Sequence, residues 1–125
     1  MSSSFRVNNL IAEKSHPTRF YSTNQEKQVA KTLGGKCTSN SGATELGGKG
    51  DILLDKFLLE CKTKTSHSRT ISVQKEWFEK NIREQVSMRK PYSAVVFNFG
   101  PNEENYYIID EYLFKVLLEK LKESD

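Results

Sequence analysis

The sequence predicts an α/β domain in which helices pack on both faces of a mixed β-sheet. An apolar hairpin at residues 50–62 is followed by a helical pattern at about 72–89 and by the apolar run SAVVFNF at 93–99. A hairpin pairs its strands antiparallel, whereas a helix between two strands allows them to pair in parallel. With 125 residues, the chain is long enough for one domain with a hydrophobic core.

The composition is that of a soluble globular protein. Hydrophobic residues make up 36% of the chain and charged residues 28%, which argues against general disorder. No apolar run approaches the roughly 20 residues needed to span a bilayer, and the first 14 residues lack the apolar segment of a secretory signal. Cys37 and Cys61 have no CxxC spacing, so neither a zinc site nor a disulfide framework is indicated. We expect no membrane association and a reducing, cytoplasmic location.

The net charge of +3 is unevenly distributed along the chain. Basic residues dominate the N-terminal part and the loop from Lys62 to Arg69, while acidic residues gather from Glu103 onward. A basic front and an acidic rear suit a protein that binds a polyanion with one surface. The alternative is an ordinary solvated surface of mixed charge.

The N-terminal half is predicted to contain one helix and one polar loop. Residues 1–22 show no sustained periodicity and are expected to form a basic arm, with the domain at 23–125. Thr23 and Glu26 fit a capping box, which predicts a helix that starts there and ends at Gly34-Gly35. The Gly/Ser-rich residues 36–50 predict either a plain loop or a mobile loop beside a site, with an optional first strand ahead of the hairpin.

The C-terminal half is predicted to contain two more helices and two strands. The helix at about 72–89 has an apolar face made of Val73, Trp77, Phe78, Ile82 and Val86. Strands are expected at 93–99 and 105–110. Asp110 can cap a last helix, whose apolar stripe consists of Leu113, Val116, Leu117 and Leu121.

The hairpin places three charged residues together in the most apolar part of the chain. If its turn is centred on Asp55-Lys56, Asp51 lies opposite Glu60, and Lys62 lies on the same face as Glu60. Two opposed carboxylates repel each other, and this repulsion can be relieved in two ways. Lys62 could neutralise one acid while the other stays in water, or a divalent cation such as Mg²⁺ could bind between the two acids.

These residues resemble a known signature. Gly50-Asp51 followed by Glu60-Cys61-Lys62 is similar to the PD…(D/E)xK pattern of the restriction-endonuclease-like nucleases, with Gly50 in place of Pro. NQEKQVAKTLGGK, the Gly/Ser-rich loop, LLECKTK and ISVQKEWFEK resemble the small archaeal and phage-type Holliday-junction resolvases of that superfamily. The resemblance covers roughly residues 25–99. It implies the αβββαβ core of that superfamily, with a mixed central sheet flanked by helices.

The resemblance also implies roles for individual residues. Asp51 and Glu60 would bind the metal with the main-chain carbonyl of Cys61, and Lys62 would lie beside the attacking water. Glu26 would complete the site, often through water, a role compatible with its position in the capping box.

Two residues at the start of the following helix are weaker candidates. Gln74 and Lys75 lie near where the superfamily often places an auxiliary polar side chain. Either could equally be an ordinary solvated residue of the first helical turn. We expect Gln74 to take part in catalysis and Lys75 to contact DNA.

The implied activity is Mg²⁺-dependent hydrolysis of DNA phosphodiesters, with Mn²⁺ as a possible substitute and no small-molecule cofactor. The implied substrate is branched DNA, such as the four-way junction formed in recombination. The implied enzyme is a homodimer. It would act in the cytoplasm, or in the host cytoplasm if a phage encodes the chain. The alternatives are a nicking or end-processing nuclease and a non-catalytic DNA-binding protein. DNA-backbone contacts are expected from basic side chains that could also be merely solubilising: Arg6, Lys14, Arg19, Lys36, Lys49, Lys64, Arg69 and Lys75.

Overall fold

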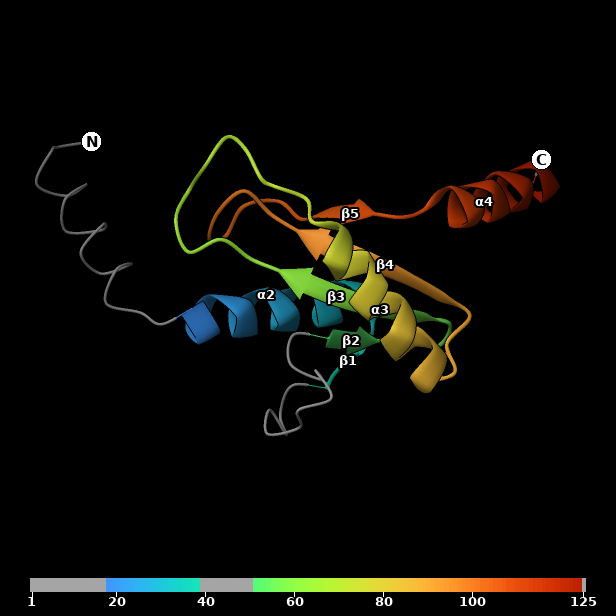
Figure 1. Cartoon of the computed structure of the whole chain (residues 1–125), viewed down its shortest axis with the longest axis horizontal. Coiled ribbons are helices and arrows are strands. Elements are labelled where there is room, and N and C mark those ends of the chain that lie inside the picture. The colour runs from blue at the N-terminus through green and yellow to red at the C-terminus, as the bar shows by residue number, and fades with distance from the viewer. Residues whose placement is uncertain (1–17, 39–50, 125) are drawn as a thin grey trace, which may run out of the picture.

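A computed structural model describes residues 18–38 and 51–124. These residues form an α/β fold of three helices and one five-stranded mixed sheet (Figure 1). The predicted α/β class is therefore confirmed. The elements are α2 (Thr18–Leu33), β1 (Lys36–Cys37), β2 (Asp51–Leu53), β3 (Phe57–Lys62), α3 (Lys75–Ser87), β4 (Tyr92–Phe97), β5 (Tyr106–Ile108) and α4 (Glu111–Glu123).

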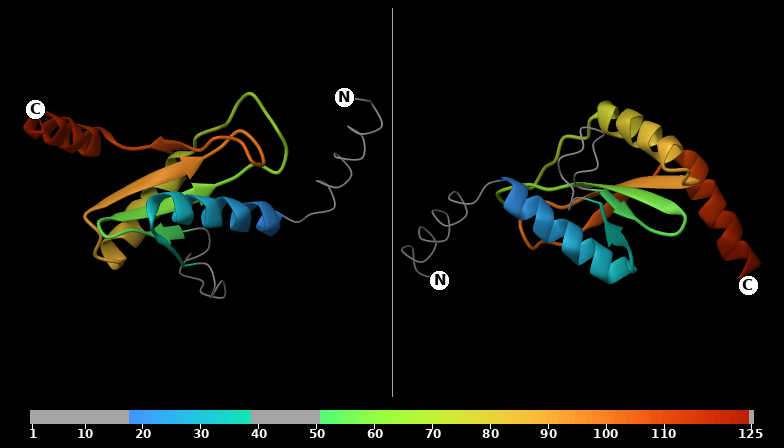
Figure 2. Two further views of the ribbon diagram at one scale, coloured as in Figure 1. Left: turned by 180° about the vertical axis from the view of Figure 1, so that it is seen from behind. Right: turned by 90° about the horizontal axis from the view of Figure 1, so that it is seen from below.

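The strands lie in the sheet in chain order, β1-β2-β3-β4-β5. Every neighbouring pair is antiparallel except β3 and β4, which are parallel and joined by the crossover helix α3. Helix α2 packs against β1, β2 and β3, and α3 packs on the opposite face against β3 and β4 (Figure 2). From α2 to β4 the order of elements is α-β-β-β-α-β, as expected.

The two faces of the sheet are filled by alternate residues of the same strands. On the α2 face the core contains Val29 from the helix and the strand residues Ile52, Leu59, Cys61, Ala94 and Val96. Leu58 and Val95 alternate with these residues and are fully buried on the α3 face. Asp51 precedes Ile52, and Glu60 lies between Leu59 and Cys61, all of which face α2. Because side chains alternate along a strand, Asp51 and Glu60 lie on the α3 face.

The register of the hairpin agrees with the prediction. Asp51 lies opposite Glu60, and the two pairs that follow it are Ile52 with Leu59 and Leu53 with Leu58. The Leu54 amide donates to the Phe57 carbonyl across the exposed Asp55-Lys56 turn, at 2.9 Å. A four-residue connection therefore sets which side chains share a face.

Helix α2 begins earlier than predicted. Thr23 and Glu26 lie inside the helix, so the predicted capping box is wrong, and residues 18–22 belong to α2 rather than to an arm. Burial of Tyr21 against the domain favours this longer helix. At the other end, Gly34 has φ of +76°, a conformation that favours glycine and ends the helix as expected. Residues 1–17, which contain the remainder of the predicted arm, lie outside the described residues.

Helix α3 buries a different face from the predicted one. Val73, Ile82 and Val86 are all more than half exposed, so these three members of the expected apolar face are wrong. Trp77 and Phe78 are partly buried, and Asn81 is fully buried with its side-chain amide donating to the Ala94 carbonyl at 3.2 Å. The helix thus turns a partly polar face toward the sheet.

Helix α4 extends away from the sheet beyond β5 (Figure 1). Asp110 caps it as predicted, because its carboxylate accepts a hydrogen bond from the Leu113 amide at 2.9 Å. Of the predicted stripe, Leu113 is buried and Val116 is partly buried, but Leu117 and Leu121 are exposed. In the described part of the chain, no helix has the length and apolarity required to cross a membrane.

Candidate metal centre

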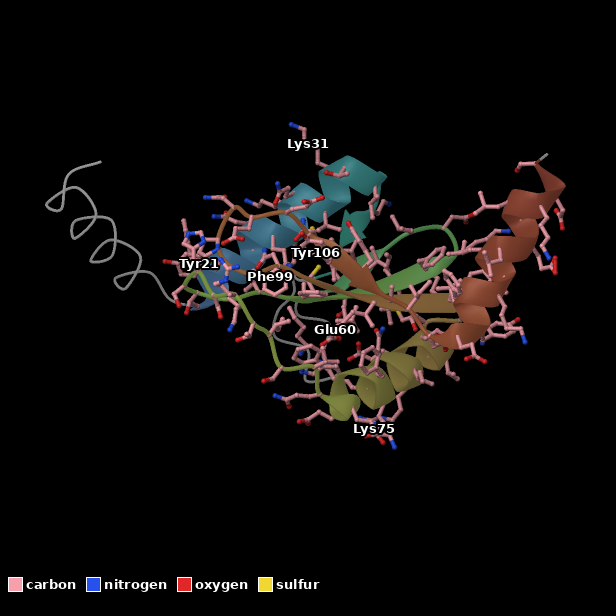
Figure 3. All side chains as sticks on the ribbon, turned by 90° about the horizontal axis from the view of Figure 1, so that it is seen from above. Tyr21, Lys31, Glu60, Lys75, Phe99 and Tyr106 are labelled. Atoms are coloured by element: carbon pink, nitrogen blue, oxygen red, sulfur yellow. The ribbon has the colours of Figure 1, made fainter. Side chains whose placement is uncertain are left out.

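Two buried carboxylates come from neighbouring strands on the α3 face of the sheet. Asp51 opens β2 and Glu60 lies opposite it near the end of β3. Asp51 is 1% exposed and Glu60 is 2% exposed. Glu60 lies between the sheet and α3, with α2 on the other side (Figure 3). The hairpin register is therefore sufficient to bring these two acids together.

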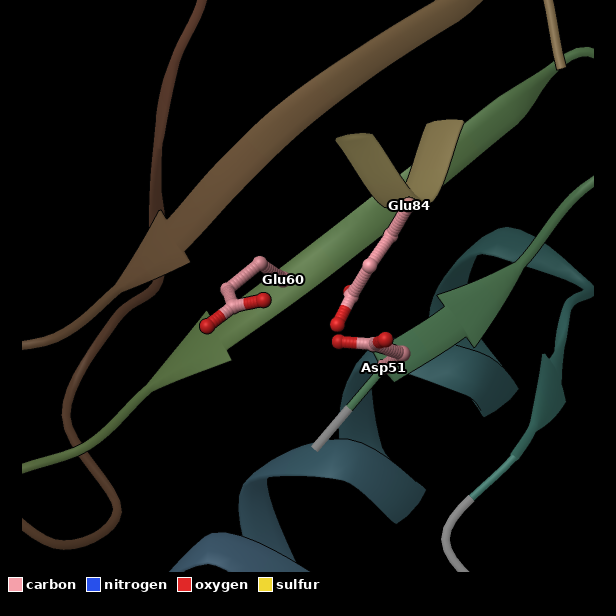
Figure 4. Close-up of side chains that lie close together, drawn as sticks. All are labelled: Asp51, Glu60 and Glu84. Atoms are coloured by element: carbon pink, nitrogen blue, oxygen red, sulfur yellow. The ribbon is translucent and has the colours of Figure 1, made fainter. Parts of the chain in front are cut away.

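A third carboxylate reaches the same place from α3. One oxygen each from Asp51, Glu60 and Glu84 lies within 4.8 Å of the others, and these three residues are called the carboxylate cluster below. Glu84 points from the helix toward Asp51 (Figure 4). Each acid also has one buried oxygen, Oδ1 of Asp51 and Oε1 of the two glutamates, that has no hydrogen-bond partner among the described residues.

Two lysines partly neutralise the carboxylate cluster. Lys62 Nζ lies 3.0 Å from Glu60 Oε2, and Lys80 Nζ lies 3.6 Å from the same oxygen and 3.8 Å from Glu84 Oε2. Lys62 also lies over the Trp77 ring, 5.2 Å from its centroid, which helps to hold the ammonium group in position. Lys62 thus pairs with one acid as expected, but Asp51 is buried rather than left in water, so that alternative is wrong.

The electrostatics of the cluster disfavour a third negative charge. Burial raises the pKa of Asp51 from 3.8 to about 9, and the hydrogen bond with Glu84 and the charge of Glu60 act in the same direction. In the metal-free protein, Asp51 therefore carries a proton at neutral pH. A cation bound between the acids would displace this proton and neutralise the group.

The donor set fits a hard divalent cation. Carboxylate oxygens are preferred ligands of Mg²⁺ and Mn²⁺, and Asp51 and Glu60 already bring such oxygens within 4.8 Å of each other in a buried place. The Cys61 side chain lies in the core on the α2 face, where burial raises the pKa of its thiol, and it is therefore no ligand. Ligation by the main-chain carbonyl of Cys61 stays a prediction.

An open cleft lies beside the carboxylate cluster. Its volume is about 320 Å³, and its lining consists of Lys62, Glu76, Trp77, Glu79, Lys80 and Arg83. Both lysines that pair with Glu60 thus also line this charged cleft. Their ammonium groups could donate to an anionic group that approaches the cluster from solvent.

Glu26 lies elsewhere. It is on α2, on the other face of the sheet, where it is 2% exposed and raises the pKa of the Cys37 and Cys61 thiols in addition to their burial. It is not part of the close group of three acids found among the described residues. Its predicted contribution to the metal site is untested.

Gln74 and Lys75 begin α3 at the opposite end from Glu84. Gln74 is the exposed N-cap residue and makes no side-chain capping bond. Ten residues of helix, roughly 15 Å, separate it from Glu84. The structure therefore does not bring Gln74 into the carboxylate cluster, and its catalytic role stays a prediction.

The predicted DNA contacts are only partly described. Lys36, Arg69 and Lys75 are exposed, and Lys64 donates to the Thr70 carbonyl at 3.2 Å. Arg6, Lys14, Lys49 and the side chain of Arg19 lie outside the described residues. Contacts of all these residues with DNA stay predictions.

Sequence reasoning missed Glu84 and Lys80. The signal was present in the helical spacing, because Lys80 and Glu84 follow Trp77 by three and seven residues and therefore share its face. The prediction placed the buried face on the side of Ile82 and Val86 because these residues are apolar, but the structure exposes both of them.

Comparisons with family models, curated proteins and solved structures find no match to this chain. The resemblance to the nuclease superfamily therefore rests on the residues quoted above.

Proposed function

We propose that this protein is a metal-dependent endodeoxyribonuclease that acts on branched DNA. One observation carries the proposal: two strand acids, Asp51 and Glu60, lie opposite each other and are buried, and Lys62 Nζ lies 3.0 Å from Glu60. Each acid has one buried oxygen without a hydrogen-bond partner among the described residues. Burying carboxylates close together is costly, and a bound cation would offset their repulsion more completely than the two lysines beside Glu60 do. The pairing also supports the roles that the PD…(D/E)xK resemblance implies for these residues.

In this proposal, each residue has a defined task. Asp51 and Glu60 would hold Mg²⁺, which would supply Lewis-acid polarisation of a phosphoryl oxygen and lower the pKa of a water. Lys62 donates hydrogen bonds to the attacking water or to a phosphate oxygen, and Trp77 restricts its position. The water oxygen forms a bond to phosphorus, one phosphorus–oxygen ester bond breaks, and the leaving oxygen takes up a proton.

The charged cleft is where the DNA backbone would enter. Lys62, Lys80 and Arg83 place cationic groups along it, next to the carboxylate cluster. Such contacts recognise phosphates rather than base sequence. They suit an enzyme that selects DNA by shape, as the resemblance to Holliday-junction resolvases implies.

Symmetric cutting of a four-way junction requires two active sites, so the working form would be a C2 homodimer. Helix α4 supports this proposal, because its apolar side chains are exposed in the single chain. They include Tyr112 and Leu121, each 66% exposed, and also Phe114, Leu117 and Leu118. Patches of this kind commonly mark protein–protein contacts.

The test is cleavage of a labelled four-way junction, a matched linear duplex and a single strand, each with Mg²⁺ and with EDTA. The proposal predicts paired, symmetric nicks in the junction that require Mg²⁺ and disappear in Asp51→Asn. Equal cleavage of linear DNA would support the metal-dependent chemistry but contradict the preference for junctions. The protein would then be a general or end-processing nuclease. Binding of DNA without cleavage in Mg²⁺ or Mn²⁺ would contradict the enzyme and favour a non-catalytic DNA-binding protein.

A further inference from the structure

Glu84 occupies a position that the nuclease resemblance does not assign. It projects from α3 onto Asp51, and its side chain is 14% exposed. Its Oε1 is buried without a hydrogen-bond partner among the described residues. A glutamate side chain in contact with solvent on an amphipathic helix could turn outward, so its inward position requires a compensating interaction.

The lysines and a hydrogen bond with Asp51 supply part of that interaction, but Oε1 of Glu84 is left without a partner among the described residues. Lys62 and Lys80 both approach Glu60 Oε2, and Lys80 is 3.8 Å from Glu84, at the outer limit of an ion pair. Within the described part of the chain, no ammonium group lies within 4.0 Å of Asp51. Both cations therefore lie on the Glu60 side of the carboxylate cluster, and neither forms an ion pair with Asp51.

The geometry of the buried oxygens points to a binding position between the three acids. Asp51 and Glu60 are each at least 98% buried, and each has one buried oxygen without a hydrogen-bond partner among the described residues. One oxygen from each of these acids lies within 4.8 Å of the other and of one oxygen of Glu84. Glu84 closes the third side (Figure 4). Three oxygens that converge from a hairpin and a helix leave room for waters or a substrate phosphate in the remaining positions of a Mg²⁺ shell.

We infer that Glu84 is the third carboxylate ligand of the divalent cation, and this inference rests on the metal-dependent function proposed above. Helix α3 thereby supplies the acid that the resemblance would take from Glu26 on α2. The two helices lie on opposite faces of the sheet, and only α3 shares the face of Asp51 and Glu60. Lys80 holds Glu60 and Glu84 together in the metal-free protein and yields them to the cation.

The experiment measures metal binding directly. Trp77 is the only tryptophan of the chain and lies beside Lys62, so Tb³⁺ bound at the cluster would be sensitised by indole excitation. Tb³⁺ is titrated into the metal-free full chain, and Mg²⁺ is then used to displace it. The same titration is made with Glu84→Gln, with Glu26→Gln, and with Glu119→Gln, an exposed acid on α4 outside the cleft that controls for the loss of one charge.

The inference predicts that Glu84→Gln weakens Tb³⁺ binding at least about tenfold, whereas Glu119→Gln and Glu26→Gln bind as the wild type does. Circular dichroism would confirm that Glu84→Gln is folded. Wild-type affinity in Glu84→Gln would overturn the inference and leave a site made by Asp51 and Glu60. Weaker Tb³⁺ binding in Glu26→Gln alone would indicate that the third ligand is Glu26 on α2. No Mg²⁺-displaceable Tb³⁺ binding by the wild type would refute both the inference and the metal-dependent function.

Discussion

The two faces of the central sheet differ sharply, although they are built from alternate residues of the same strands. On the α2 face, Ile52, Leu59 and Cys61 pack against Val29 as an ordinary apolar core. On the α3 face, Asp51 and Glu60 occupy the neighbouring positions and meet Glu84 and Lys80 from the helix. Burial of the apolar side chains on the first face stabilises the fold, whereas burial of the carboxylates on the second face opposes it.

This contrast separates residues that build the domain from residues that act. A sequence under no constraint except stability would place leucine or valine at Asp51 and Glu60, as it does at Leu58 and Val95 on the same face. The carboxylate cluster is therefore a local cost carried by a domain that is stabilised elsewhere. Substitutions at adjacent positions of one strand should have opposite effects on activity and stability.

The largest difference is expected in DNA cleavage. Glu60→Gln should lower the rate of Mg²⁺-dependent cleavage at least about 100-fold, because it removes a charged ligand and the partner of Lys62. Cys61→Ala, one residue further on but on the α2 face, keeps its main-chain carbonyl and should cleave at nearly the wild-type rate. Single-turnover kinetics on a labelled junction would measure both rates, and equal losses in the two variants would contradict the division between faces.

Stability should show the reverse order. Ile52→Ala removes a fully buried side chain from the α2-face core and should lower the free energy of unfolding by about 2–5 kcal/mol. Asp51 directly precedes Ile52, and Asp51→Asn removes a buried acid that lies beside two others. The free energy of unfolding of the metal-free Asp51→Asn variant should therefore equal or exceed that of the wild type. Urea unfolding in EDTA would measure both changes. A strongly destabilised Asp51→Asn would mean that the cluster supports the fold.

The pH dependence of stability should sharpen the same contrast. The pKa of Asp51 is raised from 3.8 to about 9, so between these values the folded chain keeps a proton that the unfolded chain releases. The stability contributed by this proton is fully present below about pH 4 and is lost as the pH rises through about 9. In EDTA, wild-type stability should fall across this window relative to Asp51→Asn. Parallel pH profiles of the two proteins would show that Asp51 ionises normally.

The smallest effect on the fold is expected in α4. Replacing the exposed Leu117 and Leu121 by lysine should change the free energy of unfolding of one chain by less than about 0.5 kcal/mol per site. It should nevertheless shift a dimer toward monomers, because it puts charge into the proposed contact. Analytical ultracentrifugation would follow the association, with Glu119→Lys on the same helix as the matched control. A wild-type monomer at all concentrations would remove α4 as a dimer surface.

Local sequence signals predicted those parts of the structure that local interactions determine. Strand alternation and the turn at Asp55-Lys56 were enough for the hairpin register, and with it the pairing of Asp51 and Glu60. The Asp110 cap of α4 is likewise set within a few residues.

The rest depended on tertiary packing. Glu84 is 24 residues from Glu60 along the chain, and its approach to the cluster follows from how α3 rotates over the sheet. Because Asn81 finds a buried partner in the Ala94 carbonyl, that helix could bury a polar face and expose Ile82 and Val86. The early start of α2 similarly reflects the burial of Tyr21, which outweighed the capping signal at Thr23.

The most direct test of the account is the thermal unfolding of the wild type and Asp51→Asn in EDTA and in Mg²⁺ or Mn²⁺. A cation that binds only the folded chain stabilises it by about 2.7 kcal/mol at one hundred times its dissociation constant, or roughly ten degrees in a domain of this size. The account predicts this rise for the wild type and little or none for Asp51→Asn. Unchanged melting of the wild type, or the same rise in both proteins, would contradict a cation site on the charged face of the sheet.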